Sequence, residues 1–210
     1  MIDNQNHLFY DLTILTQQKE SMMTKIQKVS RYFLISFKIL LILLPLCALI
    51  QWLFIDTTPM KTLMDLGLIQ AAISTPEGYV SLGTVHWTIL AKFVGFIAQS
   101  LGLLPLFLSL FALKSVFQNY QKGEIFNTMN ARSYRYLGCL FFLYALIVEP
   151  LSNLLMVLAV TLTNPPGHRY ITLAFGTLNL EALYCGMLVI VISWVMLEAS
   201  KLRDEQELTI

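Results

Sequence analysis

Charged residues are scarce in this chain of 210 residues. Asp, Glu, Lys and Arg make up 13% of it, hydrophobic residues make up 56%, and the mean hydropathy is +0.65. Soluble domains carry about a quarter charged residues, and a soluble chain this apolar would expose large aggregation-prone patches. The composition therefore predicts a membrane protein. The net charge of +1 gives no reason to expect direct nucleic-acid binding.

Cysteines are few, and recognisable catalytic motifs are absent from the sequence. Cys47, Cys139 and Cys185 lie in apolar stretches and form no CxxC pair, so we expect buried thiols without a disulfide or metal site. The sequence contains no GxSxG, no HExxH and no phosphate-binding Gly-Lys-Ser/Thr loop. It therefore predicts neither an enzyme nor a bound cofactor.

What the chain does have is four long apolar stretches. Each is long enough to cross roughly 30 Å of hydrocarbon, which takes about 20 helical residues, and unpaired backbone groups cannot remain in lipid. The predicted spans are residues 32–55, 87–117, 136–162 and 171–197. The expected fold is all-α, a polytopic membrane protein with a four-helix transmembrane domain over 31–198, a basic amphipathic segment (1–30) and a tail (199–210).

Basic residues are concentrated on one side of the predicted membrane. Four lie in the N-terminal segment, four around the loop between spans two and three, and two in the tail, against two in the other loops. Because positively charged loops stay in the cytoplasm, both termini are predicted to be cytoplasmic. The long outer loop, about 56–86, is predicted to hold a surface helix over 60–73.

Two predicted cytoplasmic segments have a distinctive sequence. Gly123-Glu124-Ile125-Phe126 follows the second span, and the chain ends in Glu205-Gln206-Glu207-Leu208-Thr209-Ile210. They resemble the signatures of a bacterial four-span membrane family catalogued only as a domain of unknown function, over roughly residues 31–210. The resemblance implies a bacterial cytoplasmic (inner) membrane and no established activity, so it carries over no site residues.

The loop motif and the tail each allow two interpretations. Gly123 can adopt the left-handed conformation that ends a helix, and Asn127 or Thr128 can cap the next helix, which would make the motif a structural turn. The alternative is that the motif docks a partner. In the tail, Leu202, Leu208 and Ile210 either form an apolar stripe for a partner or pack beside the loop.

Polar residues inside the predicted spans are the sharper chemical signal. A carboxylate in hydrocarbon costs a few kcal/mol, so it should face the bundle interior and find a partner. We expect Lys92 to reach Glu181. The set is either a proton- or ion-responsive cavity, with Glu149 neutral because of desolvation, or a network that fixes helix packing. The candidate residues are Lys92, Gln99, Glu149, Asn153, Asn179 and Glu181.

These features favour a small regulatory or interaction protein that meets a protein partner through its cytoplasmic loop and tail. The alternative is a transporter or channel-like protein that uses Lys92, Glu149 and Glu181. Four spans are few for a monomeric transporter, so this alternative predicts a homo-oligomer. Small residues spaced by four predict close helix contacts in either case, at Ala91–Gly95, Ala98–Gly102 and Ala182–Gly186.

Overall fold

The computed structural model describes residues 3–69, 72–75, 78–165, 169 and 179–208. Within this part of the chain, four helices are long and apolar enough to cross a membrane: Lys25–Leu53, Ile89–Gln121, Thr128–Thr161 and Leu180–Gln206. The prediction of a mainly helical chain with four helices that could span a membrane is therefore confirmed. The predicted beginning of span four, residues 171–178, lies outside the described residues.

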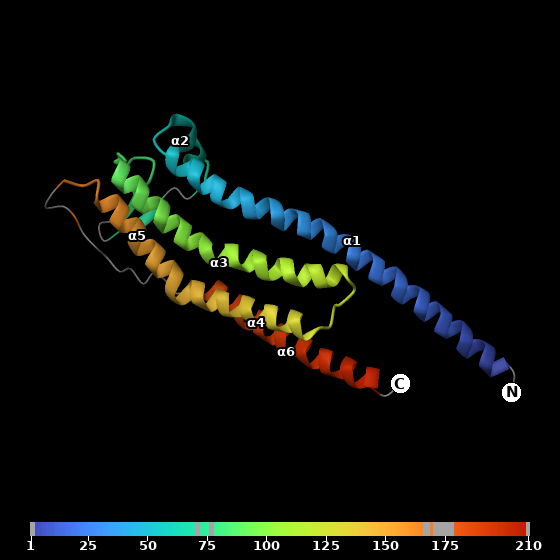
Figure 1. The fold of residues 1–210 in the computed structure, drawn as a ribbon. Coiled ribbons are helices and arrows are strands. Elements are labelled where there is room, and N and C mark those ends of the chain that lie inside the picture. Colours follow the sequence, from blue (N-terminus) through green and yellow to red (C-terminus); the bar gives the residue numbers. More distant parts are fainter. Residues whose placement is uncertain (1–2, 70–71, 76–77, 166–168, 170–178, 209–210) are drawn as a thin grey trace.

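The long helices are arranged side by side, and both termini lie at the same end of the molecule (Figure 1). The first helix packs on α3, α3 packs on both parts of the third span, and α4 packs on α6. Residues 3–30 continue the first span as one helix, which extends beyond the other helices (Figure 1). The elements are α1 (Asp3–Leu53), α3 (Ile89–Gln121), α4 (Thr128–Leu143), η1 (Tyr144–Val148), α5 (Glu149–Thr161) and α6 (Leu180–Leu208).

The third span changes its helical geometry in the middle. The π-helical turn η1 separates α4 from α5, and α5 begins with Glu149 followed by Pro150. Proline has no backbone N–H, so a regular α-helix cannot close its hydrogen bond there. The wider turn before Pro150 accommodates that missing donor, and turns of this kind occur often at functional sites.

The long loop between α1 and α3 folds into a small structure that we call the cap (residues 54–88). It holds α2 (Thr58–Asp65) and an antiparallel hairpin of β1 (Ala72–Thr75) and β2 (Gly78–Ser81). The predicted surface helix over 60–73 is therefore wrong beyond Asp65. Gly67 adopts φ +70°, and the amide of Leu68 bonds to the Leu63 carbonyl, which ends the helix.

A hydrophobic core lies under the cap, at the end of the bundle opposite the termini. Trp52 and Trp87 meet edge to face with ring centroids 5.1 Å apart. A β-branched residue, Ile73, points into this core from β1, which explains why a strand forms where an amphipathic helix was expected. The buried cluster comprises Trp52, Ile55, Met60, Met64, Ile73, Leu82, Trp87, Ala91, Ala98, Met156, Val157, Ala159 and Val160.

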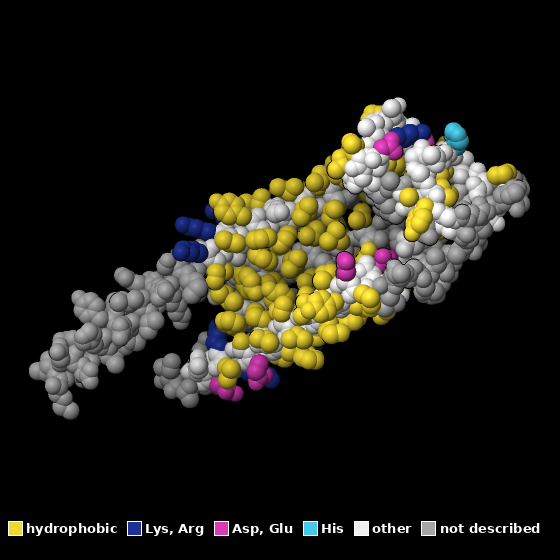
Figure 2. Space-filling model, turned by 180° about the vertical axis from the view of Figure 1, so that it is seen from behind, with side chains coloured by type: hydrophobic (Ala, Val, Ile, Leu, Met, Phe, Trp, Pro, Cys, Tyr) yellow, Lys and Arg dark blue, Asp and Glu magenta, His cyan; other side chains and the backbone are white. Residues whose placement is uncertain are grey.

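Away from the cap, large apolar side chains face outward along the spans. Figure 2 shows a broad band of hydrophobic side chains over the helices, with Lys and Arg side chains beyond both ends of the band, toward the termini and at the cap. The prediction of buried cysteines is wrong, because Cys47, Cys139 and Cys185 are all exposed on the protein surface. In a membrane-spanning chain, lipid surrounds an outward thiol as favourably as a protein core would.

Small residues permit the closest helix contacts, as predicted. A Cβ on Gly95 would collide with the ring of Trp52, so the absence of a side chain at Gly95 lets Trp52 of α1 pack on α3. Gly186 of α6 meets Gly138 of α4, where a Cβ would lie 3.1 Å from the Gly138 carbonyl oxygen. Without these glycines the backbones could not approach so closely.

Candidate functional site

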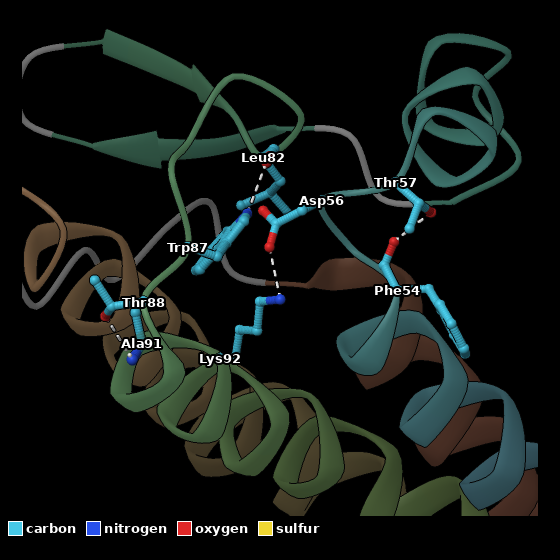
Figure 3. Close-up of polar contacts among 8 residues, drawn as sticks. All are labelled: Phe54, Asp56, Thr57, Leu82, Trp87, Thr88, Ala91 and Lys92. Atoms are coloured by element: carbon cyan, nitrogen blue, oxygen red, sulfur yellow. Dashed lines mark hydrogen bonds and ion pairs between the residues drawn. The ribbon is translucent and has the colours of Figure 1, made fainter.

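Lys92, in the first turn of α3, pairs with a residue of the cap and not with the predicted intramembrane cluster. Its Nζ lies 2.6 Å from Oδ2 of Asp56, directly after α1 (Figure 3). In the same region Trp87 donates its indole N–H to the Leu82 carbonyl at 3.0 Å, and Thr88 caps α3 by accepting from the Ala91 amide (Figure 3). The expected pairing of Lys92 with Glu181 is therefore wrong. Asp56, the actual partner, was not among the predicted site residues.

Deeper in the membrane-spanning region, Gln99 joins α3 to α1. Its side-chain amide donates to Oε1 of Gln51 at 2.8 Å, and its own Oε1 accepts from the indole N–H of Trp52. The N–H and the oxygen of this partly buried amide both have a partner, as an apolar environment requires. Gln51 was missed in the sequence because it lies at the end of span one and resembles an interfacial residue.

Glu149 and Asn179 are brought together from different helices. The side-chain N–H of Asn179 donates to Oε2 of Glu149 at 3.0 Å, and Oδ1 of Asn179 accepts from the Ala182 amide at 3.0 Å. The second bond caps the first turn of α6 and fixes which end of the Asn179 amide faces Glu149. Two of the predicted polar residues thus form a direct contact between the third and fourth spans.

A cavity of about 310 Å³ lies between α3 and the η1–α5 part of the third span. Oxygen- and nitrogen-bearing side chains make up more than half of its lining residues, which is unusual for a site within a transmembrane region. Tyr144 and Ser152 were not predicted, since a lone hydroxyl in an apolar stretch carries little signal. The lining consists of Gln99, Gly102, Leu103, Tyr144, Glu149, Ser152, Asn153 and Met156.

Glu181 does not belong to this cavity. It is exposed in the first turn of α6, two positions after Asn179. Successive helical residues turn by about 100°, so a residue two positions further along points almost opposite. Because Asn179 faces Glu149, Glu181 faces outward. The predicted cluster is therefore reduced to Gln99, Glu149, Asn153 and Asn179.

At the end that carries the termini, the Gly-Glu-Ile-Phe motif forms a hydrogen-bonded turn. Gly123 has φ +85°, in the left-handed region, and α3 ends there as predicted. Asn127 caps α4 by accepting from the Met129 amide at 3.0 Å, and its side-chain N–H donates to Oε2 of Glu124 at 3.0 Å. The structural interpretation of the motif accounts for these contacts.

Asn130 organises the turn from beneath and was missed in the sequence. It is completely buried, and its side-chain N–H groups donate to the carbonyls of Glu124 at 2.8 Å and Ile125 at 2.9 Å. Its Oδ1 accepts from the Asn119 side chain at 2.7 Å. One amide therefore fixes the loop backbone to both α3 and α4. An asparagine three residues after a cap is the only sequence signal for this role, and it is weak.

The tail lies against the loop motif. The guanidinium of Arg203 donates to the Phe126 carbonyl at 3.3 Å, across the space between α6 and the loop. A cavity of about 250 Å³ opens between them. We call its lining the loop–tail surface: Glu124, Phe126, Asn127, Thr128, Ser200, Arg203 and Asp204. The side chains of Glu207 and Leu208, and all of Thr209 and Ile210, lie outside the described residues.

Comparison with known protein families gives a match. A family described as "Protein of unknown function (DUF2975)" matches residues 15–210. The chain belongs to this family. Its match includes all four spans, the loop and the tail, which confirms the resemblance drawn from the sequence. No curated protein and no solved structure matches the chain. The DUF2975 description assigns no function and transfers no site residue.

Proposed function

We propose that this DUF2975 protein is a non-catalytic interaction protein of a bacterial inner membrane that binds a protein partner through its loop–tail surface. Both termini and that surface would face the cytoplasm. The location of both termini at one end of the bundle is consistent with this orientation (Figure 1). The excess of basic residues in the same segments supports it through the positive-inside rule.

The observation that carries the proposal is that the loop motif and the beginning of the tail form one surface. Arg203 bonds to the loop backbone at Phe126, although the two residues are far apart in the sequence. The loop is held in place by buried Asn130, so a partner would not have to order it. Preorganised surfaces bind more tightly because less conformational entropy is lost.

The exposed side chains on this surface suit a protein partner. Phe126 is 46% exposed and Leu202, on the adjacent tail, is 56% exposed. Phe126 lines a pocket that also carries the carboxylates of Glu124 and Asp204, and Leu202 precedes the pocket residue Arg203 in α6. Aromatic and Arg side chains beside a polar pocket are the usual centres of binding energy in protein interfaces.

A site-specific crosslinking experiment in intact cells tests the proposal. A photoreactive residue at Thr128 should capture a protein partner, and Arg203→Glu should reduce the yield strongly. Lys201→Glu makes the same charge change two residues away, outside the pocket, and should leave the yield unchanged. Unchanged capture after deletion of the tail beyond Ser200 would contradict the proposal.

The polar cavity favours a second candidate, an oligomeric transporter or channel-like protein. This candidate now depends on Glu149 alone among the charged residues, because Lys92 pairs with Asp56 and Glu181 faces outward. Flux into proteoliposomes should fall with Glu149→Gln and persist with Glu181→Gln. Absence of flux, or equal flux in both variants, removes this candidate.

A further inference from the structure

Glu149 has a neutral partner but no cationic one. Its carboxylate accepts from the Asn179 amide at 3.0 Å. Among the described residues, no Lys or Arg forms an ion pair with it, and the nearest candidate from the sequence, Lys92, is paired with Asp56. A carboxylate in an apolar layer needs either a proton or a counter-charge, because desolvation of the bare ion is costly.

The surroundings of Glu149 can solvate a cation. Tyr144, Ser152 and Asn153 supply neutral oxygens on the same cavity wall. Ser152 uses its hydrogen to donate to the Ala98 carbonyl at 2.7 Å, which leaves its oxygen lone pairs available. Oxygen ligands of this kind are preferred by hard cations. A volume of about 310 Å³ also leaves room for several waters at ~30 Å³ each.

The backbone next to Glu149 departs from a regular α-helix. Pro150 provides no amide, so a carbonyl in the preceding turn lacks its usual helical donor. The π-helical turn η1 lies in that same segment and ends directly before Glu149. Carbonyl oxygens released in this way coordinate monovalent ions in other membrane proteins with interrupted helices.

We propose that this cavity binds a monovalent alkali cation beside the Glu149 carboxylate. One carboxylate surrounded by neutral oxygens matches a single positive charge. Divalent ions are usually held by several carboxylates, and the described residues contain no group of three or more His, Cys, Asp or Glu that could hold a metal ion. This inference rests on the cavity of the second candidate function and names the class of ligand that the cavity binds. It requires that the cation binds, and it does not require that the cation is transported.

Thermal unfolding of the full-length protein in zwitterionic nanodiscs tests the inference. NaCl or KCl would replace N-methylglucamine chloride at constant ionic strength. Binding should raise Tm saturably, by about 3–6 °C at a tenfold excess over the dissociation constant.

Two glutamate variants separate this site from general salt effects. Glu149→Gln should abolish the cation-dependent shift, and Glu181→Gln, which faces outward, should retain it. If Glu149→Gln does not fold, Asn153→Ala keeps the carboxylate and should weaken binding several-fold. The inference is overturned if N-methylglucamine chloride raises Tm as much as NaCl or KCl does. It is also overturned if the cation-dependent rise in Tm persists in both Glu149→Gln and Asn153→Ala.

Binding and flux outcomes are distinguishable. Saturable Na⁺ or K⁺ binding without flux supports the cavity inference and removes the transporter candidate. Flux that depends on Glu149 without any alkali-cation shift overturns the inference and leaves a proton-only pathway for the second candidate.

Discussion

The two ends of the bundle are built in different ways. At the cap, aromatic and aliphatic side chains are buried together and the polar groups pair with one another, as Asp56 does with Lys92. At the other end, buried amides bond to backbone carbonyls while Phe126 and Leu202 remain exposed. Hydrophobic burial gives the cap stability, whereas hydrogen bonding gives the loop a defined shape. The first arrangement depends on a hydrophobic core, and the second depends on hydrogen bonds to backbone carbonyls.

The largest expected effect is at the cap end, with Trp52→Ala. Trp52 is buried beside Trp87, wedges against Gly95 and bonds to Gln99. Its loss should reduce the free energy of unfolding by about 3–5 kcal/mol, measured by denaturation in mixed micelles. Trp194→Ala is the matched control, because Trp194 is 64% exposed along the spans. Equal losses in the two variants would show that the cap core is not the main source of stability.

The next largest effect tests the loop end, with Asn130→Ala. The change leaves the Glu124 and Ile125 carbonyls and the Asn119 amide without this partner. An unsatisfied buried polar group costs about 1–3 kcal/mol, and water can reach part of the loop, so we expect a total of about 2–3 kcal/mol. The exposed amide variant Gln118→Ala should cost less than about 0.5 kcal/mol. A loss as small as the control's would mean that water replaces Asn130 fully.

Features set by local backbone chemistry could be predicted from the sequence. Four apolar runs gave four helices, Gly123 ended α3, and Asn127 capped α4. Each depends on neighbouring residues alone. Ala72 and Ile73, the first two residues of β1, were assigned to a helix because the core contact of Ile73 is with residues distant in the sequence.

Side-chain partners across helices could not be predicted. Lys92 was assigned to Glu181 because both lay at a similar depth, but helix rotation decides which residues meet. The same rotation turned Glu181 outward and brought Asn179 to Glu149. For Cys139 and Cys185, apolar sequence context could not distinguish a protein core from lipid, since both are apolar. The depth of a residue in the membrane follows from counting residues along the helix, whereas the direction in which its side chain points is known only from the packed structure.

A smaller effect is expected from the Asp56–Lys92 pair. Both side chains are partly exposed, at 44% and 27%, so solvent screens their attraction. A double-mutant cycle of Asp56→Asn and Lys92→Gln should give a coupling free energy of about 1 kcal/mol or less, decreasing with added salt. Coupling above about 3 kcal/mol that is insensitive to salt would instead place the pair in a desolvated part of the cap.

The smallest effect on stability is expected from Arg203→Gln. The Arg203 bond to the Phe126 carbonyl is long, at 3.3 Å, and exposed, so its loss should change the free energy of unfolding by less than about 0.5 kcal/mol. The position of the tail should nevertheless change, because this bond joins α6 directly to the loop backbone. Spin labels at Thr128 and Leu202, in a variant whose native cysteines are replaced by Ser, should report a broader distance distribution.

Lys201→Gln provides the matched control for that measurement. Lys201 pairs with Glu198 on its own helix at 3.2 Å, so its removal should leave the loop-to-tail distance distribution narrow. A broad distribution in Arg203→Gln with unchanged stability fits a surface shaped for a partner. A loss of stability comparable to that of Asn130→Ala would instead show that the tail contributes to the stability of the fold. The loop end would then stabilise the bundle, as the cap end does, through different kinds of contact.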